Sequence, residues 1–189
     1  MKAIVCKEFG APSKLVLEDT GPLSPKKNEI LIDIHAAGVN FPDTLIIKDM
    51  YQFKPALPFT PGNEVAGVVS AIGEEVTAYS IGDEVIAMPA FGGYAEQIVV
   101  SPSQASKKPV NMDFATAACF STTYGTSHYG LKDKAQLKEG ETVLILGASG
   151  GVGISAIEIA KAMGAKVIAA ASTDEKLTVC KEYGADELI

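Results

Sequence analysis

Apolar residues in the first hundred positions occur in short alternating runs, separated by Gly, Pro and Asn. Alternation with a period of two is typical of strands that bury one face, and closely spaced short strands favour a partly open antiparallel barrel. His35 falls on the polar face of its run, so we interpret it as a strand residue and not as a ligand. The predicted strands are Ala3–Cys6, Leu15–Glu18, Glu29–Ala37, Val65–Ile72, Asp83–Met88 and Ala95–Val100.

Helical segments are predicted between and after these strands. One helix is predicted to begin near Pro42, since proline is favoured at the first helical position, and to end before Tyr51. Residues Lys107–Asn111 resemble a linker. Asp113 can then cap a helix over Ala115–Cys119, and a further helix covers Tyr124–Lys132.

The pattern changes after Gly140 to strand, helix and strand. Val143–Leu146 is a short, continuous apolar run, and Val167–Ala171 is a second one. Runs of this length are typical of buried parallel strands. Between them, Ile154–Met163 reads as a helix with Gly164 just past its end. This order is the first βαβ unit of a dinucleotide-binding fold.

Glycines dominate the turn between the first strand and the helix. The spacing Gly147-x-x-Gly150-x-x-Gly153 is one residue longer than the usual fingerprint, so an ordinary glycine-rich βα loop is the alternative. The flanking strands and helix favour a nucleotide site, because glycines let the backbone approach a pyrophosphate held by the helix N-terminus. The residues expected to line this turn are Gly147, Ser149, Gly150, Gly151, Val152 and Gly153.

The end of the second strand favours NADPH over NADH. An NAD site has Asp or Glu about 20 residues past the glycines to accept from the ribose hydroxyls. Here Ser172 and Thr173 offer hydroxyl groups and Lys176 offers a cation for a 2′-phosphate. Asp174 and Glu175 remain the alternative as ribose acids, if the strand extends further.

The composition narrows the class of protein and its possible partners. The chain has 189 residues, of which 47% are hydrophobic and 21% charged, as in a globular protein. The net charge of −7 argues against nucleic acid as a partner, and no apolar run is long enough to span a membrane. The N-terminus lacks a signal or transit pattern. Three widely spaced cysteines indicate reduced, mostly buried thiols and a cytoplasmic protein.

Four motifs in order resemble one family. Gly38–Asp43, Pro61–Gly67, Gly92–Glu96 and Gly147–Gly153 are similar to segments of the quinone oxidoreductases. These are the zinc-independent, zeta-crystallin-like branch of the medium-chain dehydrogenase/reductase superfamily. The resemblance implies a GroES-like catalytic domain over residues 1–122. It also implies a partial Rossmann domain over residues 123–189, with NADPH between the two. The fold class is therefore mixed α/β, with a partly open β-barrel preceding a parallel sheet.

The resemblance also implies site residues. Zinc-dependent relatives have cysteine and histidine where this chain has Asn40 and Asn63, so no metal is expected. Asn40, Asp43 and Tyr51 would line the quinone side, and Thr126 would contact the nicotinamide region. Asn40 could donate a hydrogen bond to a developing quinone oxyanion, or it could serve only as a turn residue. Tyr51 could equally be a packed aromatic.

Several functions remain open at this level. The leading one is an NADPH-dependent quinone reductase, with a quinone or another conjugated carbonyl as substrate. Reduction of an alkenal or enoyl thioester requires the same hydride geometry. A non-catalytic binding or assembly module is the alternative from another class. The chain stops soon after one βαβ unit, so we expect either a piece of a longer enzyme or a shortened product. A full-length form would form homo-oligomers through the Rossmann sheet.

Overall fold

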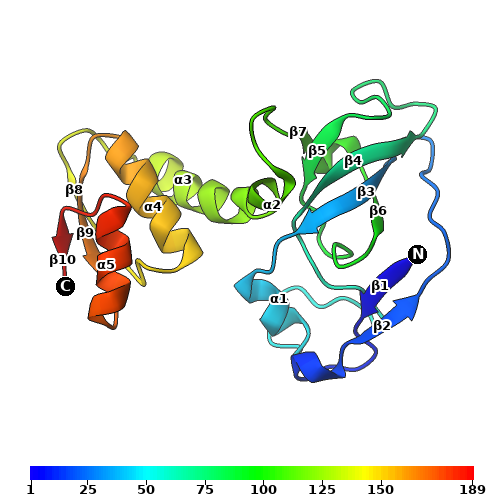
Figure 1. Ribbon diagram of the computed structural model, residues 1–189, viewed down its shortest axis with the longest axis horizontal. Coiled ribbons are helices and arrows are strands. Elements are labelled where there is room, and N and C mark those ends of the chain that lie inside the picture. Colours follow the sequence, from blue (N-terminus) through cyan, green and yellow to red (C-terminus); the bar gives the residue numbers. More distant parts are fainter. The chain divides into compact units, whose positions relative to one another are not determined.

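The computed structural model describes all residues from Met1 to Ile189. It divides into two compact units, Met1–Cys119 and Phe120–Ile189, which are described separately below (Figure 1). The first unit is built on an antiparallel sheet and the second on a parallel one, so the predicted mixed α/β fold is confirmed. None of the helices has the length and apolar character that crossing a membrane requires.

The first unit contains a five-stranded antiparallel sheet and a two-stranded hairpin. In the large sheet the strand order is β6-β3-β4-β5-β7. Isolated bridges from Ala3 to Ala95 and from Cys6 to Phe59 join the hairpin to the rest of the unit. The strands are β1 (Lys2–Val5), β2 (Val16–Asp19), β3 (Ile30–Ala37), β4 (Val65–Ile72), β5 (Glu84–Ala87), β6 (Gln97–Val100) and β7 (Ala105–Lys107).

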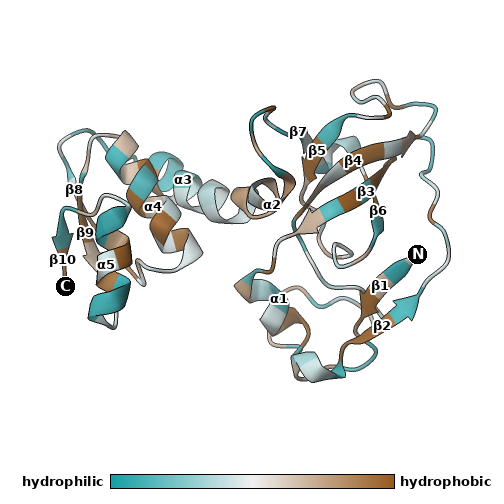
Figure 2. Ribbon diagram, viewed as in Figure 1, coloured by the Kyte–Doolittle hydropathy of each residue, from teal (hydrophilic) through white to brown (hydrophobic).

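The core of this unit consists of β-branched side chains on alternating positions of the central strands. Ile30 and Ile32 of β3 pack with Val65 and Val69 of β4 and Val85 of β5, and all five are fully buried. Figure 2 shows brown apolar segments in these strands, interrupted by a teal hydrophilic one in β3. Burial of each such side chain contributes about 1.5–3 kcal/mol, so the sheet is a firm support for the loops at its ends.

Short helices of the first unit lie near the predicted positions. Helix α1 covers Phe41–Ile46, and α2 covers Phe114–Ala117. The predicted cap of the second is confirmed, because the Asp113 carboxylate accepts from Thr116 N at 2.9 Å. Two 3₁₀ turns, Pro12–Lys14 and Pro102–Gln104, complete the unit.

The linker predicted at Lys107–Asn111 is partly wrong. Lys107 ends strand β7, which pairs with β5. The side chain of Lys108 is buried and forms an ion pair with Glu84 at 2.9 Å. Lysine and serine in a three-residue edge strand give no strand pattern, so only the pairing reveals it.

The second unit is a three-stranded parallel sheet in the order β10-β9-β8, packed against helices. A continuous helical stretch from Ser121 to Lys134 precedes it and is longer than the predicted Tyr124–Lys132. Residues 126–128 of that stretch are α3, and the flanking turns have π-type hydrogen bonds. The other elements are β8 (Thr142–Leu146), α4 (Gly151–Ala162), β9 (Lys166–Ala170), α5 (Asp174–Glu182) and β10 (Glu187–Leu188).

Strand β8 is not fully buried, contrary to the prediction. Ile145 is buried, whereas Leu144 is 51% exposed and Leu146 is 76% exposed. β8 is the edge strand of its sheet, and one of its faces has no covering element within this unit. Helix α4 also begins at Gly151, three residues before the predicted start, because glycine is tolerated in the first turn of a helix.

Candidate functional site

The turn from β8 into α4 uses its glycines in three different ways. Gly147 has a φ of +61°, which favours glycine. Gly153 lies so close to the preceding loop that a Cβ there would be 2.5 Å from the Ala148 carbonyl oxygen. At Gly150 a Cβ would meet only the Gly147 oxygen, at 3.5 Å, which leaves space above the turn. The turn therefore combines a tight bend, an open approach and close helix packing.

The N-terminus of α4 faces this open space. The first N–H groups of a helix have no acceptor within the helix, and a helix of 12 residues carries a partial positive charge at this end. Gly150 is the N-cap and provides no side chain to satisfy these donors. Gly151 and Val152 therefore present backbone donors suited to an anion such as a phosphate.

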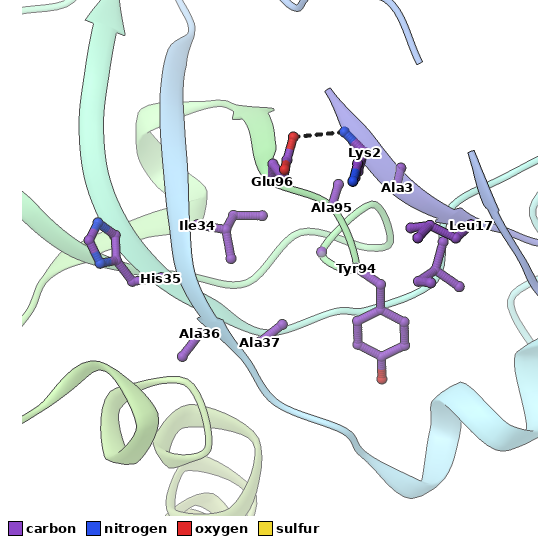
Figure 3. A pocket seen from close by; sticks show the side chains of 12 residues that line it. Lys2, Ala3, Leu17, Ile34, His35, Ala36, Ala37, Tyr94, Ala95 and Glu96 are labelled. Atoms are coloured by element: carbon purple, nitrogen blue, oxygen red, sulfur yellow. Dashed lines mark hydrogen bonds between the residues drawn. The ribbon is translucent and has the colours of Figure 1, made fainter. Parts of the chain in front are cut away.

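A pocket of about 480 Å³ lies elsewhere, on the first unit, between the β1–β2 hairpin and the end of β3. Figure 3 shows Glu96 accepting from the backbone N of Lys2, with the Tyr94 hydroxyl pointing away from this pair. The pocket floor is made largely of alanine and aliphatic side chains, and it does not include the predicted substrate residues.

A pocket of about 330 Å³ opens at the carboxyl ends of β8 and β9 in the second unit. Lys176 Nζ donates to Ser172 Oγ at 3.0 Å at this pocket, so the predicted cation and hydroxyl come together. Thr173 does not line it. Its hydroxyl is the N-cap of α5 and accepts from Lys176 N. The lining residues are Gly147, Ser149, Ala170, Ala171, Ser172 and Lys176.

The two acidic residues that competed for the ribose lie outside this lining. β9 ends at Ala170, and Asp174 and Glu175 are in the first turn of α5. The pKa of Glu175 is lowered by a hydrogen bond from its own backbone N–H and then by the Thr173 hydroxyl. The carboxylate of Glu175 is therefore used to cap its own helix.

Thr126 lies on α3 and is exposed. The next residue, Ser127, belongs to a buried pair of hydroxyl groups that the sequence did not reveal. Ser127 Oγ and Ser155 Oγ are 2.8 Å apart, and each can also donate to the carbonyl of Val152. Ser155 Oγ lies 3.0 Å from the Thr123 carbonyl as well. This network fixes the helical stretch that carries Thr126 onto α4.

In the first unit, Asn40 is joined to the two residues that follow Gly62. Asn40 Nδ2 donates to Glu64 Oε2 at 3.1 Å and to Asn63 Oδ1 at 3.3 Å. Glu64 is fully buried. Both amide hydrogens of Asn40 are therefore engaged, and donation to a substrate oxygen would require one of these bonds to be given up.

Asp43 supports Asn40 from the other side. Asp43 Oδ2 accepts from Asn40 N at 2.9 Å and from the Tyr94 hydroxyl at 2.8 Å. Asp43 is only 4% exposed, and its second oxygen has no hydrogen-bond partner. Burial and then the hydrogen bond to Asp43 raise the pKa of Tyr94 well above its usual value, so its hydroxyl remains a donor. Tyr94 belongs to the motif Gly92–Glu96, but the sequence alone indicated no role for it.

Tyr51 and the three cysteines differ from Asn40 and Asp43 in their surroundings. Tyr51 is half-buried against the apolar cluster that contains Cys6, Ile46 and Phe59, which matches the packed-aromatic alternative. The pKa of the Cys119 thiol is raised by partial burial and then by the negative charge of Glu64. Cys119 is exposed, whereas Cys6 and Cys180 are buried.

Two family models match this chain. Residues 26–110 match the family model described as alcohol dehydrogenase GroES-like domain, and residues 151–189 match the one described as zinc-binding dehydrogenase. The two matches place an alcohol dehydrogenase GroES-like unit before a unit of the zinc-binding dehydrogenase family in one chain. The chain belongs to the medium-chain dehydrogenase/reductase superfamily.

Within that superfamily the chain is similar to proteins named quinone oxidoreductase. It is 40% identical to the human one over 190 residues, which is 100% of this chain and 58% of that protein. The Escherichia coli quinone oxidoreductase, solved in complex with NADPH, has a TM-score of 0.95 and 33% identity over 100% of this chain and 58% of its own. The CurK enoyl reductase structure matches with a TM-score of 0.91 and 33% identity, over 99% of this chain and 58% of its own.

Proposed function

We propose that this chain belongs to an NADPH-dependent oxidoreductase that transfers hydride to a quinone without zinc. The observation that carries the proposal is the pocket at the ends of β8 and β9, where Lys176 and Ser172 stand near the glycine turn and no carboxylate lines the wall. In this proposal residues 1–122 form the catalytic domain, and residues 123–189 form the first part of the NADPH-binding domain. The protein is cytoplasmic, and its full-length form pairs through the Rossmann sheet.

The residues of the second unit fit NADPH. The pyrophosphate would lie above Gly150 and accept from the N–H groups of Gly151 and Val152. The 2′-phosphate would lie against Lys176 and Ser172, because a cation and a hydroxyl recognise a phosphate that a ribose-binding acid would repel. Thr173 would add a hydroxyl at the rim, and Thr126 would lie near the nicotinamide.

The first unit would supply the substrate side. When bound, NADPH supplies a hydride, which carries two electrons. The quinone thereby becomes a hydroquinone monoanion, and a proton from solvent completes the hydroquinone. Asn40 and Tyr51 would line the quinone, and Asp43 would hold Asn40 in place through its backbone N–H. The chain's own contribution is orientation of the carbonyl and exclusion of water.

Zinc does not fit the residues at this position. A catalytic zinc site needs three protein ligands among Cys, His and carboxylates. Here two carboxamides, Asn40 and Asn63, are hydrogen-bonded to each other, and Asn40 turns its NH₂ group toward Glu64. No group of three or more His, Cys, Asp and Glu side chains in this structure is arranged to hold a metal ion.

Two other functions are kept as alternatives. The similarity to an enoyl reductase favours an alkenal or enoyl thioester as a second candidate substrate, because either presents a flat conjugated carbonyl. A non-catalytic binding or assembly role would instead require loss of cofactor binding. Comparison of turnover between a quinone such as duroquinone and an enoyl thioester separates the two enzymes.

Cofactor titration tests the proposal directly. We expect Lys176→Glu to weaken NADPH binding by about 10- to 100-fold, which corresponds to about 1–3 kcal/mol for a charge-assisted contact, and to leave NADH binding almost unchanged. Lys181→Glu, the same charge reversal at the other end of α5, is the matched control. Binding of both cofactors is followed by nicotinamide fluorescence. An unchanged preference in Lys176→Glu would remove the argument for NADPH.

A further inference from the structure

We propose that Asn63 donates the hydrogen bond that holds the carbonyl oxygen of the substrate, and that Asn40 and Glu64 orient its amide. The inference deepens the proposed reduction of a conjugated carbonyl and rests on it. It assigns to Asn63 the donor role that the sequence had suggested for Asn40.

The first step is the orientation of Asn40. One of its two amide hydrogens is directed at Glu64 Oε2 and the other at Asn63 Oδ1. Rotation of this amide by 180° would bring its carbonyl oxygen against the buried Glu64 carboxylate, which would replace an attraction by a repulsion. The charge of Glu64 therefore fixes the direction of the Asn40 amide.

The second step is the orientation of Asn63. Because Asn63 Oδ1 accepts from Asn40, the Asn63 NH₂ group points away from Asn40. No side chain or carbonyl of the protein accepts from Asn63 Nδ2, and Asn63 is partly exposed, unlike Glu64 beside it. Asn63 is thus the amide of this cluster with hydrogens available to a ligand. Acceptance of a hydrogen bond at Oδ1 polarises the Asn63 amide, so the bond from Asn40 strengthens the Asn63 NH₂ group as a donor.

The backbone around Asn63 is held on both sides. Gly62 has a φ of +96°, and a Cβ there would be 2.5 Å from the Tyr94 ring. Its carbonyl accepts from Gly93 N at 2.9 Å, and the Glu64 carbonyl accepts from Gly38 N at 3.0 Å. A donor on a fixed backbone loses little freedom when it meets a substrate, and this is the condition for stabilising charge that develops during a reaction.

The chemical role follows from where charge appears. Hydride transfer leaves a negative charge on the quinone oxygen until a proton arrives from solvent, so a donor at that oxygen favours the transfer. Asn63 Nδ2 would stabilise this charge through an N–H···O bond and would itself keep its protons. Removal of one such donor typically lowers kcat on the order of 10²–10³-fold.

The test uses Asn63→Asp, which keeps an acceptor for Asn40 and removes both donor hydrogens. We expect kcat with duroquinone and NADPH to fall on the order of 10²-fold, and NADPH affinity to stay within about twofold. Asn111→Asp makes the same chemical change at an exposed position and should retain the kcat of the unsubstituted protein.

A second measurement does not depend on the folding of the variant. In the unsubstituted protein, titration with duroquinone should shift the side-chain amide resonances of Asn63 and leave those of Asn111 in place. Unshifted Asn63 resonances, or an Asn63→Asp variant with undiminished kcat, would overturn the inference and leave the proposed function standing. If the unsubstituted protein neither binds NADPH nor reduces a quinone or an enoyl substrate, the proposed function fails and this inference fails with it.

Discussion

The hydroxyl of Tyr94 is expected to stabilise the first unit more than an ordinary buried tyrosine hydroxyl does. It donates at 2.8 Å to Asp43, a carboxylate that is 4% exposed and has one oxygen without a partner. Tyr94→Phe keeps the ring that packs on Gly62 and removes this donor. Hydrogen bonds to charged groups contribute about 1.5–3 kcal/mol, so we expect a loss of about 2 kcal/mol.

Tyr79→Phe is the matched control within the same unit. Tyr79 Oη donates at 2.5 Å to the Ala105 carbonyl, a neutral acceptor, so its loss should be about 1 kcal/mol. The chain has no tryptophan, and its two units need not unfold together. Hydrogen exchange of the amides in α1 and β4 therefore measures the loss better than a single denaturation curve. Equal losses in the two variants would refute the argument that the charge of Asp43 matters.

Alkaline pH gives an independent check on the same hydroxyl. The pKa of Tyr94 in the folded protein is raised, first by burial and then by Asp43, whereas an unfolded tyrosine titrates near pH ~10. Above that pH the unfolded chain loses the proton and the folded chain keeps it, so stability falls as pH rises. Tyr94→Phe should lack this part of the fall, which the folded wild-type hydroxyl causes above pH ~10. A fall of the same size in both proteins would contradict the burial argument.

Two further predictions concern the second unit. The pKa of the Asp186 carboxyl is lowered by the hydrogen bond from Lys161 and then by that from the N–H of Val167. The stabilising contribution of this carboxylate is therefore present above pH ~4 and is lost as pH falls through its folded pKa. In Asp186→Asn the loss of Val167 amide protection between about pH 5 and pH 2 should be smaller. Gly153→Ala should destabilise α4, because its Cβ would be 2.5 Å from the Ala148 carbonyl oxygen. Gly130→Ala has open space around its Cβ and should instead stabilise the second unit by up to about 1 kcal/mol, as measured by thermal unfolding.

The elements that the sequence predicted best are those whose pattern reflects one local cause. Val65–Ile72 was predicted with its observed bounds, because its apolar run ends where the turn at Gly73 begins. The Asp113 cap depends only on residues three positions apart. The partial exposure of β8 could not be predicted in this way, since a continuous apolar run is compatible with one buried face or two. That difference depends on which elements cover the sheet.

The sequence singled out individual residues of the proposed site, and it did not reveal which of them contact each other. Asn40 and Asn63 were singled out, but only folding shows that one amide is the donor to the other across 23 positions. The contact of Tyr94 with Asp43 spans 51 positions, and that of Ser127 with Ser155 spans 28. Such pairs leave no periodic signal, because each residue would also be acceptable alone on a polar surface.

The three motifs of the first unit meet around one pair of amides, Asn40 and Asn63. Gly38, just past the end of β3, lets the backbone pass so close to Ala118 that a Cβ would be 2.2 Å from its carbonyl oxygen, and this places Asn40 two residues later. Gly93 N donates to the Gly62 carbonyl, and the missing side chain of Gly62 leaves room for the Tyr94 ring beside the backbone of Asn63. Tyr94 then reaches Asp43, which holds the backbone of Asn40. A substitution at any of these glycines is therefore expected to displace both amides at once.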